Sequence, residues 1–225
     1  MNMKTWKLAA LVAALVAIVA VGIFGGRWYG DNHKSNFSKD TELYVYPGME
    51  ASLLLKAIPD SVVIRRRSLE RVMRDLPPEQ IRPGHYVIEK GKPSVYVPRM
   101  IRAGWQTPVK LVLSGTMRLK GGIARKISNQ MMMDSTEVAA ALNDRDLLAT
   151  YGFNPTNVFS LIMPDTYEVY WTMTPDDFLR RMEREYEHYW NDDRKKKAES
   201  VGLTPDEVAD ITWENAKRLY RLEKL

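Results

Sequence analysis

Residues 164–171 combine the side-chain types that bind sugars: short acids, a hydroxyl and aromatic rings. Aromatic rings stack on the apolar faces of sugars, while carboxylates and hydroxyls form hydrogen bonds with sugar hydroxyls. The candidate substrate-binding residues of this stretch are Asp165, Thr166, Tyr167, Glu168 and Tyr170. An alternative interpretation is a turn between a strand and a helix, with the aromatic rings in the core. Composition by itself favours neither interpretation.

The residue counts restrict the chemistry that such a site could perform. The 225 residues include no cysteine, which excludes thiol nucleophiles, cysteine-based zinc sites and iron–sulfur clusters. The histidines, His33, His85 and His188, are too scattered to predict a histidine metal centre. We therefore expect neither a metal nor another cofactor. Acid–base chemistry would have to use carboxylates, as enzymes that cleave sugar chains do.

The basic residues give a formal net charge of +5, from 33 Lys and Arg against 28 Asp and Glu. The run Arg65, Arg66 and Arg67 predicts either a site for an anionic polymer or lipid headgroups, or a solvated turn, and we favour the turn. We expect no nucleic-acid partner, because no aromatic stacking platform with interleaved basic residues occurs. A second basic run, residues 194–197, is better explained by the dipole of a helix that ends there.

Residues 8–26 carry no charged or strongly polar side chain and predict a membrane-spanning helix. At about 1.5 Å per residue this run covers roughly 28 Å, close to the thickness of a hydrocarbon core. Trp6 before it and Trp28 and Tyr29 after it would lie at the two membrane interfaces. A cleaved signal peptide is the alternative, but its apolar region is usually shorter. We predict a retained anchor with a cytoplasmic N-terminus and the rest of the chain outside the cytoplasm.

After a polar linker at residues 30–40, residues 41–115 predict a small α/β or α+β module. Its expected strands are 41–46, 85–88 and 109–113, and its expected helices are 51–58, 68–76 and 94–103. Ser68 is the predicted N-cap of the second helix, and Gly104 is the predicted C-cap of the third.

The pattern of residues 116–225 is mostly helical. Apolar residues at a spacing of four, beginning with Leu119, predict a helix over 117–133. Further helices are expected from Asp134 or Ser135, over 144–151, from Thr174 to about Lys197, and after Thr204. Residues 157–171 instead alternate around Pro164, which predicts extended chain broken by a turn.

Several short segments, in this order, resemble the endolytic murein transglycosylases, the MltG or YceG-like family. Residues 163–170, MPDTYEVY, resemble the PDTY motif of that family. The other similar segments are RPGHYVI at 82–88, MIRAG at 100–104, TPV at 107–109 and VGLTP at 201–205. The resemblance covers roughly residues 5–208 and implies an α+β fold. The implied parts are a cytoplasmic leader and transmembrane helix at 1–29, a linker at 30–40, a LysM-like module at 41–115 and a partial, mostly helical catalytic domain at 116–225.

The resemblance also implies a reaction and a location. The family cleaves the β-1,4 bond between N-acetylmuramic acid and N-acetylglucosamine within nascent glycan strands. One carboxyl group protonates the leaving oxygen while the 6-hydroxyl of the sugar closes a 1,6-anhydro ring, so neither water nor a metal is required. The implied location is the bacterial inner membrane. The implied partners are peptidoglycan glycan strands, the membrane and the cell wall synthesis machinery.

The catalytic glutamate of the family has no clear counterpart in this chain. Family members follow GLTP with a segment like ASIVEKE, whose first glutamate is the acid/base, whereas residues 209–217 read ADITWENAK. Glu214 is the nearest acid, but its neighbours do not match, and we do not assign it the catalytic role. Many members also carry an acidic residue and a glycine before PDTY, where residues 157–160 are NVFS. A truncated or divergent enzyme, a non-catalytic peptidoglycan-binding or scaffold protein, and an anchored protein-interaction module all stay open.

Overall fold

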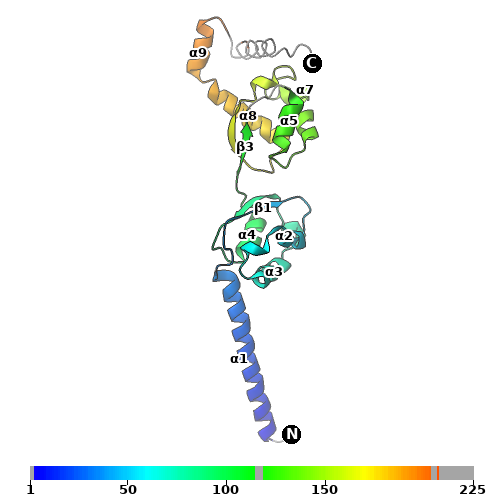
Figure 1. The fold of residues 1–225 in the computed structure, drawn as a ribbon, viewed down its shortest axis with the longest axis vertical. Coiled ribbons are helices and arrows are strands. Elements are labelled where there is room, and N and C mark those ends of the chain that lie inside the picture. Colours follow the sequence, from blue (N-terminus) through cyan, green and yellow to red (C-terminus); the bar gives the residue numbers. More distant parts are fainter. Residues whose placement is uncertain (1–2, 115–118, 204–206, 208–225) are drawn as a thin grey trace. The chain divides into compact units, whose positions relative to one another are not determined.

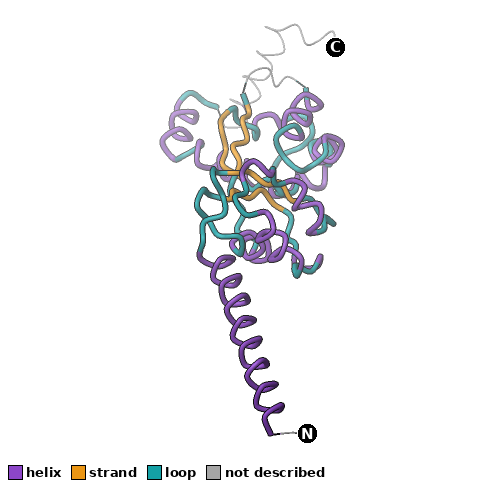
Figure 2. Tube along the Cα trace, turned by 60° about the horizontal axis from the view of Figure 1, so that its bottom comes forward, coloured by secondary structure: helices purple, strands orange, loops and turns teal. Residues whose placement is uncertain are grey.

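Two separate hydrophobic cores divide the chain into two units, Met1–Thr107 and Pro108–Leu225. The computed structural model describes residues 3–114, 119–203 and 207 (Figure 1). Within these residues, each unit contains one antiparallel sheet of two strands together with several helices (Figure 2). The described chain is therefore a mixture of helices and small sheets, in agreement with the predicted class.

Helix α1, Met3–His33, begins the first unit and confirms the predicted apolar helix (Figure 1). Its segment Ala10–His33 contains an apolar stretch with a mean hydropathy of 2.2 that is not buried by the rest of the protein, so the helix is long and apolar enough to cross a membrane. The helix also includes residues 30–33, which the sequence pattern places in the linker. Asp31 accounts for the longer helix, because its buried carboxylate accepts hydrogen bonds from a neighbouring helix.

The first sheet pairs β1, Thr41–Val45, with β2, Gly84–Ile88, and places Leu43 opposite Tyr86. The other elements of the unit are α2 (Ala51–Ala57), η1 (Asp60–Val62), α3 (Arg66–Arg74), η2 (Pro78–Gln80) and α4 (Tyr96–Ala103). Their fully buried side chains include Leu43, Leu54, Leu69, Tyr86 and Met100. Two of the expected strands and the three expected helices are thus found in this unit, with shifted ends, and the similarity of this module to LysM stays a prediction.

Helix α3 begins at Arg66, earlier than the sequence pattern predicts, and Arg65 rather than Ser68 occupies the N-cap. Ser68 is buried within the helix, where its hydroxyl donates a 2.5 Å hydrogen bond to Asp31. The prediction of Ser68 as an N-cap was wrong because its hydroxyl bonds to Asp31, which lies far away along the chain. Helix α4 ends as predicted at Gly104, whose φ of 71° is the left-handed conformation that favours glycine.

The second sheet pairs β3, Val109–Leu113, with β4, Asp165–Val169, and places Leu111 opposite Tyr167. The sequence pattern assigns residues 109–113 to the first module, but in the structure this strand pairs within the second unit. The remaining elements are α5 (Lys120–Ser128), α6 (Ser135–Ala141), α7 (Arg145–Ala149), η3 (Val158–Ser160), α8 (Pro175–Tyr189) and α9 (Asp192–Ser200).

Two predicted segments of the second unit differ in the structure. The helix expected over 117–133 ends at Ser128, and Leu119 is 55% exposed instead of lying on the buried face. Leu119 precedes the first turn of α5, so the helical spacing that places the later apolar residues in the core does not apply to it. Residues 158–160 form the short helix η3 where the alternating pattern predicts extended chain.

The long helix expected after Thr174 is divided into α8 and α9. Asn191 interrupts it by adopting an extended conformation and accepting a hydrogen bond from the backbone amide of Arg194. This is the ordinary behaviour of an asparagine N-cap. The helix expected after Thr204 falls almost wholly outside the described residues.

Two helices of the second unit begin with capping boxes that contain aspartates. Asp134 accepts hydrogen bonds from the amide and the hydroxyl of Thr136, and the side chains of Thr174 and Asp177 bond to each other's backbone amides. The Thr174 hydroxyl also donates a 2.7 Å hydrogen bond to the Asp177 carboxylate. Hydrogen bonds to the two carboxylates lower the pKa of both aspartates, and the largest cause is the hydroxyl of Thr136 for Asp134 and the hydroxyl of Thr174 for Asp177.

Lowering the pH below about 4 is therefore expected to reduce the free energy of unfolding of the second unit. A carboxyl group with a lowered folded pKa stabilises the fold above its unfolded pKa, and this stabilisation is lost as the pH falls through the folded value. The double variant Asp134→Asn, Asp177→Asn should lose less stability between about pH 7 and about pH 3, because asparagine keeps a capping oxygen that does not titrate. Urea unfolding at the two pH values measures the difference. An equal loss in the variant and the parent would show that other carboxyl groups cause it.

Candidate functional site

Strand β4 contains most of the predicted substrate-binding residues, and its pleat divides them between two faces. Tyr167 points into the core with 4% of its surface exposed, whereas Thr166 and Glu168 are exposed to solvent. In the register of the sheet, Glu168 lies opposite Lys110 of β3. The outer face of the sheet therefore presents a hydroxyl, a carboxylate and an ammonium group.

Asp165 and Tyr170 lie at the two ends of the strand, and the pleat places Asp165 on the same side of the sheet as Tyr167. Asp165 is the exposed first residue of β4, and its Oδ1 accepts a 2.7 Å hydrogen bond from the backbone amide of Thr166. Tyr170 follows the strand with 56% of its surface exposed. An exposed ring beside exposed carboxylates can stack on a sugar and accept hydrogen bonds from its hydroxyls. Asp165, Thr166, Glu168 and Tyr170 are thus available to a ligand in the described structure.

Tyr167 has a different environment from the other predicted residues. Its hydroxyl donates a 2.7 Å hydrogen bond to the carbonyl oxygen of Met163, just before the strand. Burial, followed by the negative charge of Asp165, raises the pKa of Tyr167 to about 12. Tyr167 therefore holds the strand against the core, while its neighbours along β4 face solvent. The assignment of these residues to substrate binding stays a prediction.

The sequence pattern does not predict one side chain that contacts the edge of this sheet. Gln130, just after α5, covers the outer edge of β3: its Oε1 accepts a hydrogen bond from the amide of Val112 at 2.9 Å, and its Nε2 donates to the carbonyl of the same residue at 3.2 Å. The side-chain amide thus takes the place of a third strand at this position, which protects an otherwise open edge. Only the fold brings Gln130 to Val112.

The first two residues of the basic run in the first unit follow neither of its two sequence interpretations. Arg65 donates from Nη2 to the carbonyl oxygens of Gly30 and Lys34, at the C-terminal end of α1. Arg66 donates to the carbonyls of Leu55 and Ile58, at the C-terminal end of α2. Carbonyl groups at helix ends lack partners within the helix, so these guanidinium groups satisfy them and oppose the negative end of the helix dipole. The run is therefore structural at its first two positions.

Glu214, the nearest acid to the expected catalytic position, lies outside the described residues. Among the residues that the structure describes, no group of three or more His, Cys, Asp or Glu side chains could hold a metal ion. The site that can be built from the described residues is thus the outer face of the second sheet, with Glu168 as its carboxylate and Tyr170 as its exposed ring, together with Asp165 at the exposed start of β4.

Comparison with known proteins decides the family. A sequence model of the YceG-like family matches residues 43–212, which is most of the chain. The chain belongs to the YceG-like family. The matched region of this YceG-like protein begins within β1 and includes the whole second sheet, so the outer face of β4 lies inside it. Helix α1 lies before it.

Other comparisons place fewer constraints on this YceG-like protein. The crystal structure of a yceG-like protein from Listeria monocytogenes is similar, with a TM-score of 0.41 and 13% sequence identity. The match covers 74% of the present chain and 60% of the Listeria chain, so the present chain spans less than two thirds of that protein. No curated protein matches the chain.

Proposed function

We propose that this YceG-like protein is a membrane-anchored endolytic lytic transglycosylase. It would cleave the β-1,4 bond between N-acetylmuramic acid and N-acetylglucosamine in nascent glycan strands and leave 1,6-anhydro ends during cell wall assembly. Family membership is the observation that carries this proposal. The long apolar helix α1 supports a single-pass anchor in the bacterial inner membrane, with the N-terminus in the cytoplasm as our proposed orientation. Glycan strands and the cell wall synthesis machinery are the proposed partners.

In this proposal, the outer face of the second sheet binds and orients the glycan strand. The Tyr170 ring stacks on a sugar, and Glu168 and Thr166 exchange hydrogen bonds with sugar hydroxyls, while Asp165 at the start of the strand binds hydroxyls at the end of this surface. The reaction itself needs one carboxyl group, which protonates the leaving oxygen and then accepts a proton from the 6-hydroxyl as the anhydro ring closes. We assign no residue of this chain to that proton transfer.

A second candidate function is binding of peptidoglycan without cleavage. The observation that favours it is the segment at residues 209–217, where ADITWENAK replaces the expected ASIVEKE-like sequence and Glu214 is the nearest acid. A protein with the binding face but without the acid/base would position the cell wall relative to the membrane.

Incubation of the purified full-length chain with isolated sacculi separates the two functions. Release of anhydromuropeptides, identified by mass spectrometry, is the result expected of the enzyme. Sedimentation of the protein with sacculi, without release of these products, would favour the binding protein. Neither sedimentation nor release would contradict both and would leave an anchored protein-interaction module.

The double variant Glu168→Gln, Tyr170→Ala is expected to bind sacculi about tenfold more weakly than the parent chain, because it loses a charged hydrogen-bond acceptor and a stacking ring. The matched control is Glu187→Gln, Tyr189→Ala, which removes an exposed acid and an exposed tyrosine from α8 of the same unit. Co-sedimentation at several protein concentrations gives the affinities. Equal weakening in both variants would place the glycan-binding surface elsewhere.

A further inference from the structure

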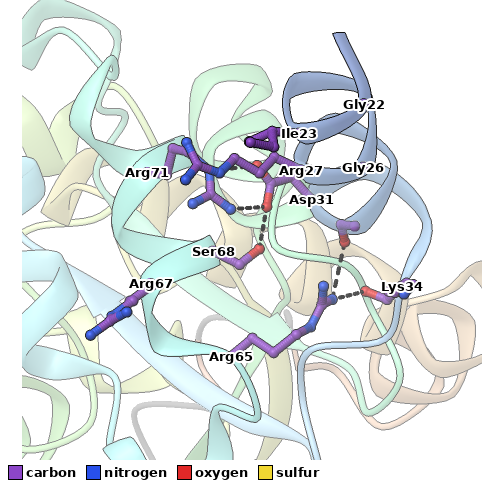
Figure 3. A pocket seen from close by; sticks show the side chains of 11 residues that line it. Gly22, Ile23, Gly26, Arg27, Asp31, Lys34, Arg65, Arg67, Ser68 and Arg71 are labelled. Atoms are coloured by element: carbon purple, nitrogen blue, oxygen red, sulfur yellow. Dashed lines mark hydrogen bonds and ion pairs between the residues drawn. The ribbon is translucent and has the colours of Figure 1, made fainter. Parts of the chain in front are cut away.

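An open cavity of about 430 Å³ lies in the first unit, where the C-terminal end of α1 meets the start of α3 (Figure 3). On the α1 side, Gly22 and Gly26 contribute only backbone, and a Cβ atom at either position would meet nothing within 4 Å. Ile23 adds an apolar side chain to the same wall. The charged residues that line the cavity are Arg27, Asp31, Lys34, Arg65, Arg67 and Arg71.

Two of these cations already have partners. Arg71 binds the carboxylate of Asp31 with two hydrogen bonds, from Nε at 2.9 Å and from Nη2 at 2.7 Å. Arg65 binds backbone carbonyl groups at the end of α1. The carboxylate of Asp31 also accepts a hydrogen bond from Ser68. Its oxygens are therefore already bonded and do not neutralise the other cations of the cavity. These contacts form a fixed wall for the cavity.

The other cations of the cavity have no such contacts. Arg27, Lys34 and Arg67 are exposed, and no hydrogen bond or ion pair of their side chains with another described residue is found. With the single carboxylate of the cavity engaged by Arg71, the cavity has an excess of positive charge that the protein does not neutralise. Guanidinium groups bind phosphate through pairs of parallel hydrogen bonds, so this charge favours a phosphate-bearing ligand.

The position of the cavity along α1 indicates the kind of phosphate. The apolar run of the sequence ends at Gly26, and Trp28 and Tyr29 follow with 62% and 55% of their surfaces exposed. Exposed Trp and Tyr at the end of a membrane helix lie at the level of the lipid headgroups. The cavity therefore extends from the last apolar turn of α1, at Ile23, to the first cationic turns beyond it.

We propose that this cavity binds the phosphate headgroup of an anionic phospholipid in the leaflet that surrounds the C-terminal end of α1. Arg27 and Arg67 are its free guanidinium ligands, Lys34 adds a third positive charge, and the first acyl carbons lie along the glycine-lined face of α1 beside Ile23. Basic pockets beside membrane helices bind acidic lipid headgroups by the same combination of charge and apolar contact. The inference depends on α1 lying in a bilayer and is independent of glycan cleavage. Loss of lipid binding and loss of glycan cleavage are therefore separate results.

Native mass spectrometry of the full-length chain in detergent tests the proposal, with phosphatidylglycerol and phosphatidylcholine of the same acyl chains as probes. The parent chain is expected to bind the first phosphatidylglycerol about fivefold more tightly than the first phosphatidylcholine. The double variant Arg27→Gln, Arg67→Gln should bind the two lipids equally. Because neither side chain has a structural partner among the described residues, the variant should keep the circular dichroism spectrum of the parent.

The matched control is Arg74→Gln, Arg102→Gln, which removes two exposed arginines of α3 and α4 that do not line the cavity. This control should keep the lipid preference. Equal loss in the two double variants would show general attraction between charges and would overturn the proposal. So would equal binding of the two lipids by the parent chain. Displacement of phosphatidylglycerol by millimolar inorganic phosphate would also overturn it, because the cavity would then be a site for free phosphate.

Discussion

Replacing Tyr167 by alanine is expected to unfold the second unit while the first unit stays folded. Tyr167 belongs to the core of the second unit, with 4% of its surface exposed. Removal of a buried aromatic ring costs about 3–5 kcal/mol through lost contacts and the cavity left behind. That is a large part of the stability of a small domain. The first unit should persist because its core consists of other residues. Hydrogen exchange followed by mass spectrometry resolves the two units, through peptides from β3 and β4 and peptides from β1 and β2.

Two further variants distinguish the contribution of the Tyr167 ring to stability from that of its hydroxyl and from that of the exposed Tyr170. Tyr167→Phe keeps the ring but leaves the carbonyl of Met163 without its hydrogen bond, which should cost about 1 kcal/mol. Tyr170→Ala, at an exposed position, should change stability by less than about 0.5 kcal/mol. If Tyr167→Ala left the exchange rates of β3 and β4 unchanged, the packing of the second sheet described here would be incorrect.

Replacing Arg71 by alanine is expected to loosen the connection between α1 and α3. The substitution leaves the carboxylate of Asp31 buried without its cation. Breaking a fully buried ion pair costs about 3–5 kcal/mol, and because the Arg71 side chain is 40% exposed we expect about 2 kcal/mol. Amide exchange should therefore accelerate at residues 30–36 and 64–68. The same experiment on Arg74→Ala, from the exposed side of α3, gives the background effect.

A double-mutant cycle identifies the origin of this effect. Asp31→Ala combined with Arg71→Ala should cost less than the sum of the single changes, because the second substitution removes a group that the first has already left unpaired. Additive costs would show that the two side chains act on the fold through separate contacts.

The polar network around Asp31 shows why local composition does not reveal the packing of residues 30–36, of which 30–33 belong to α1. Asn36 is fully buried: its amide donates to the Ser94 hydroxyl, and its oxygen accepts a hydrogen bond from the backbone of Arg65. Ser94 in turn contacts Ser68, which donates to Asp31. Each of these residues is typical of loops when its neighbours in sequence are considered alone. Their burial depends on partners that lie far away along the chain, which local composition does not encode.

Strand β3 likewise shows that the sequence pattern predicts a strand but not its pairing. Residues 109–113, VKLVL, predict a strand because they are rich in β-branched and other apolar side chains. This composition does not say which strand will be the partner, and β4 follows only after several intervening helices. The sequence also does not say which residues of β4 face the core. One side of the paired sheet packs on the core, and this packing places Tyr167 inside and Glu168 outside.

The amino-acid sequence by itself determined the apolar helix, most helix starts and ends, the position of β4 and the family, because each is encoded by neighbouring residues. Length and hydropathy specify α1, Asp134 and Thr174 cap their own helices, and the order of short segments matches the YceG-like family. Only the tertiary structure decided the strand pairing, the capping of distant helices by Arg65 and Arg66, and the cationic cavity beside α1. These depend on contacts between residues far apart in the chain, whose free energy appears only when the whole unit folds.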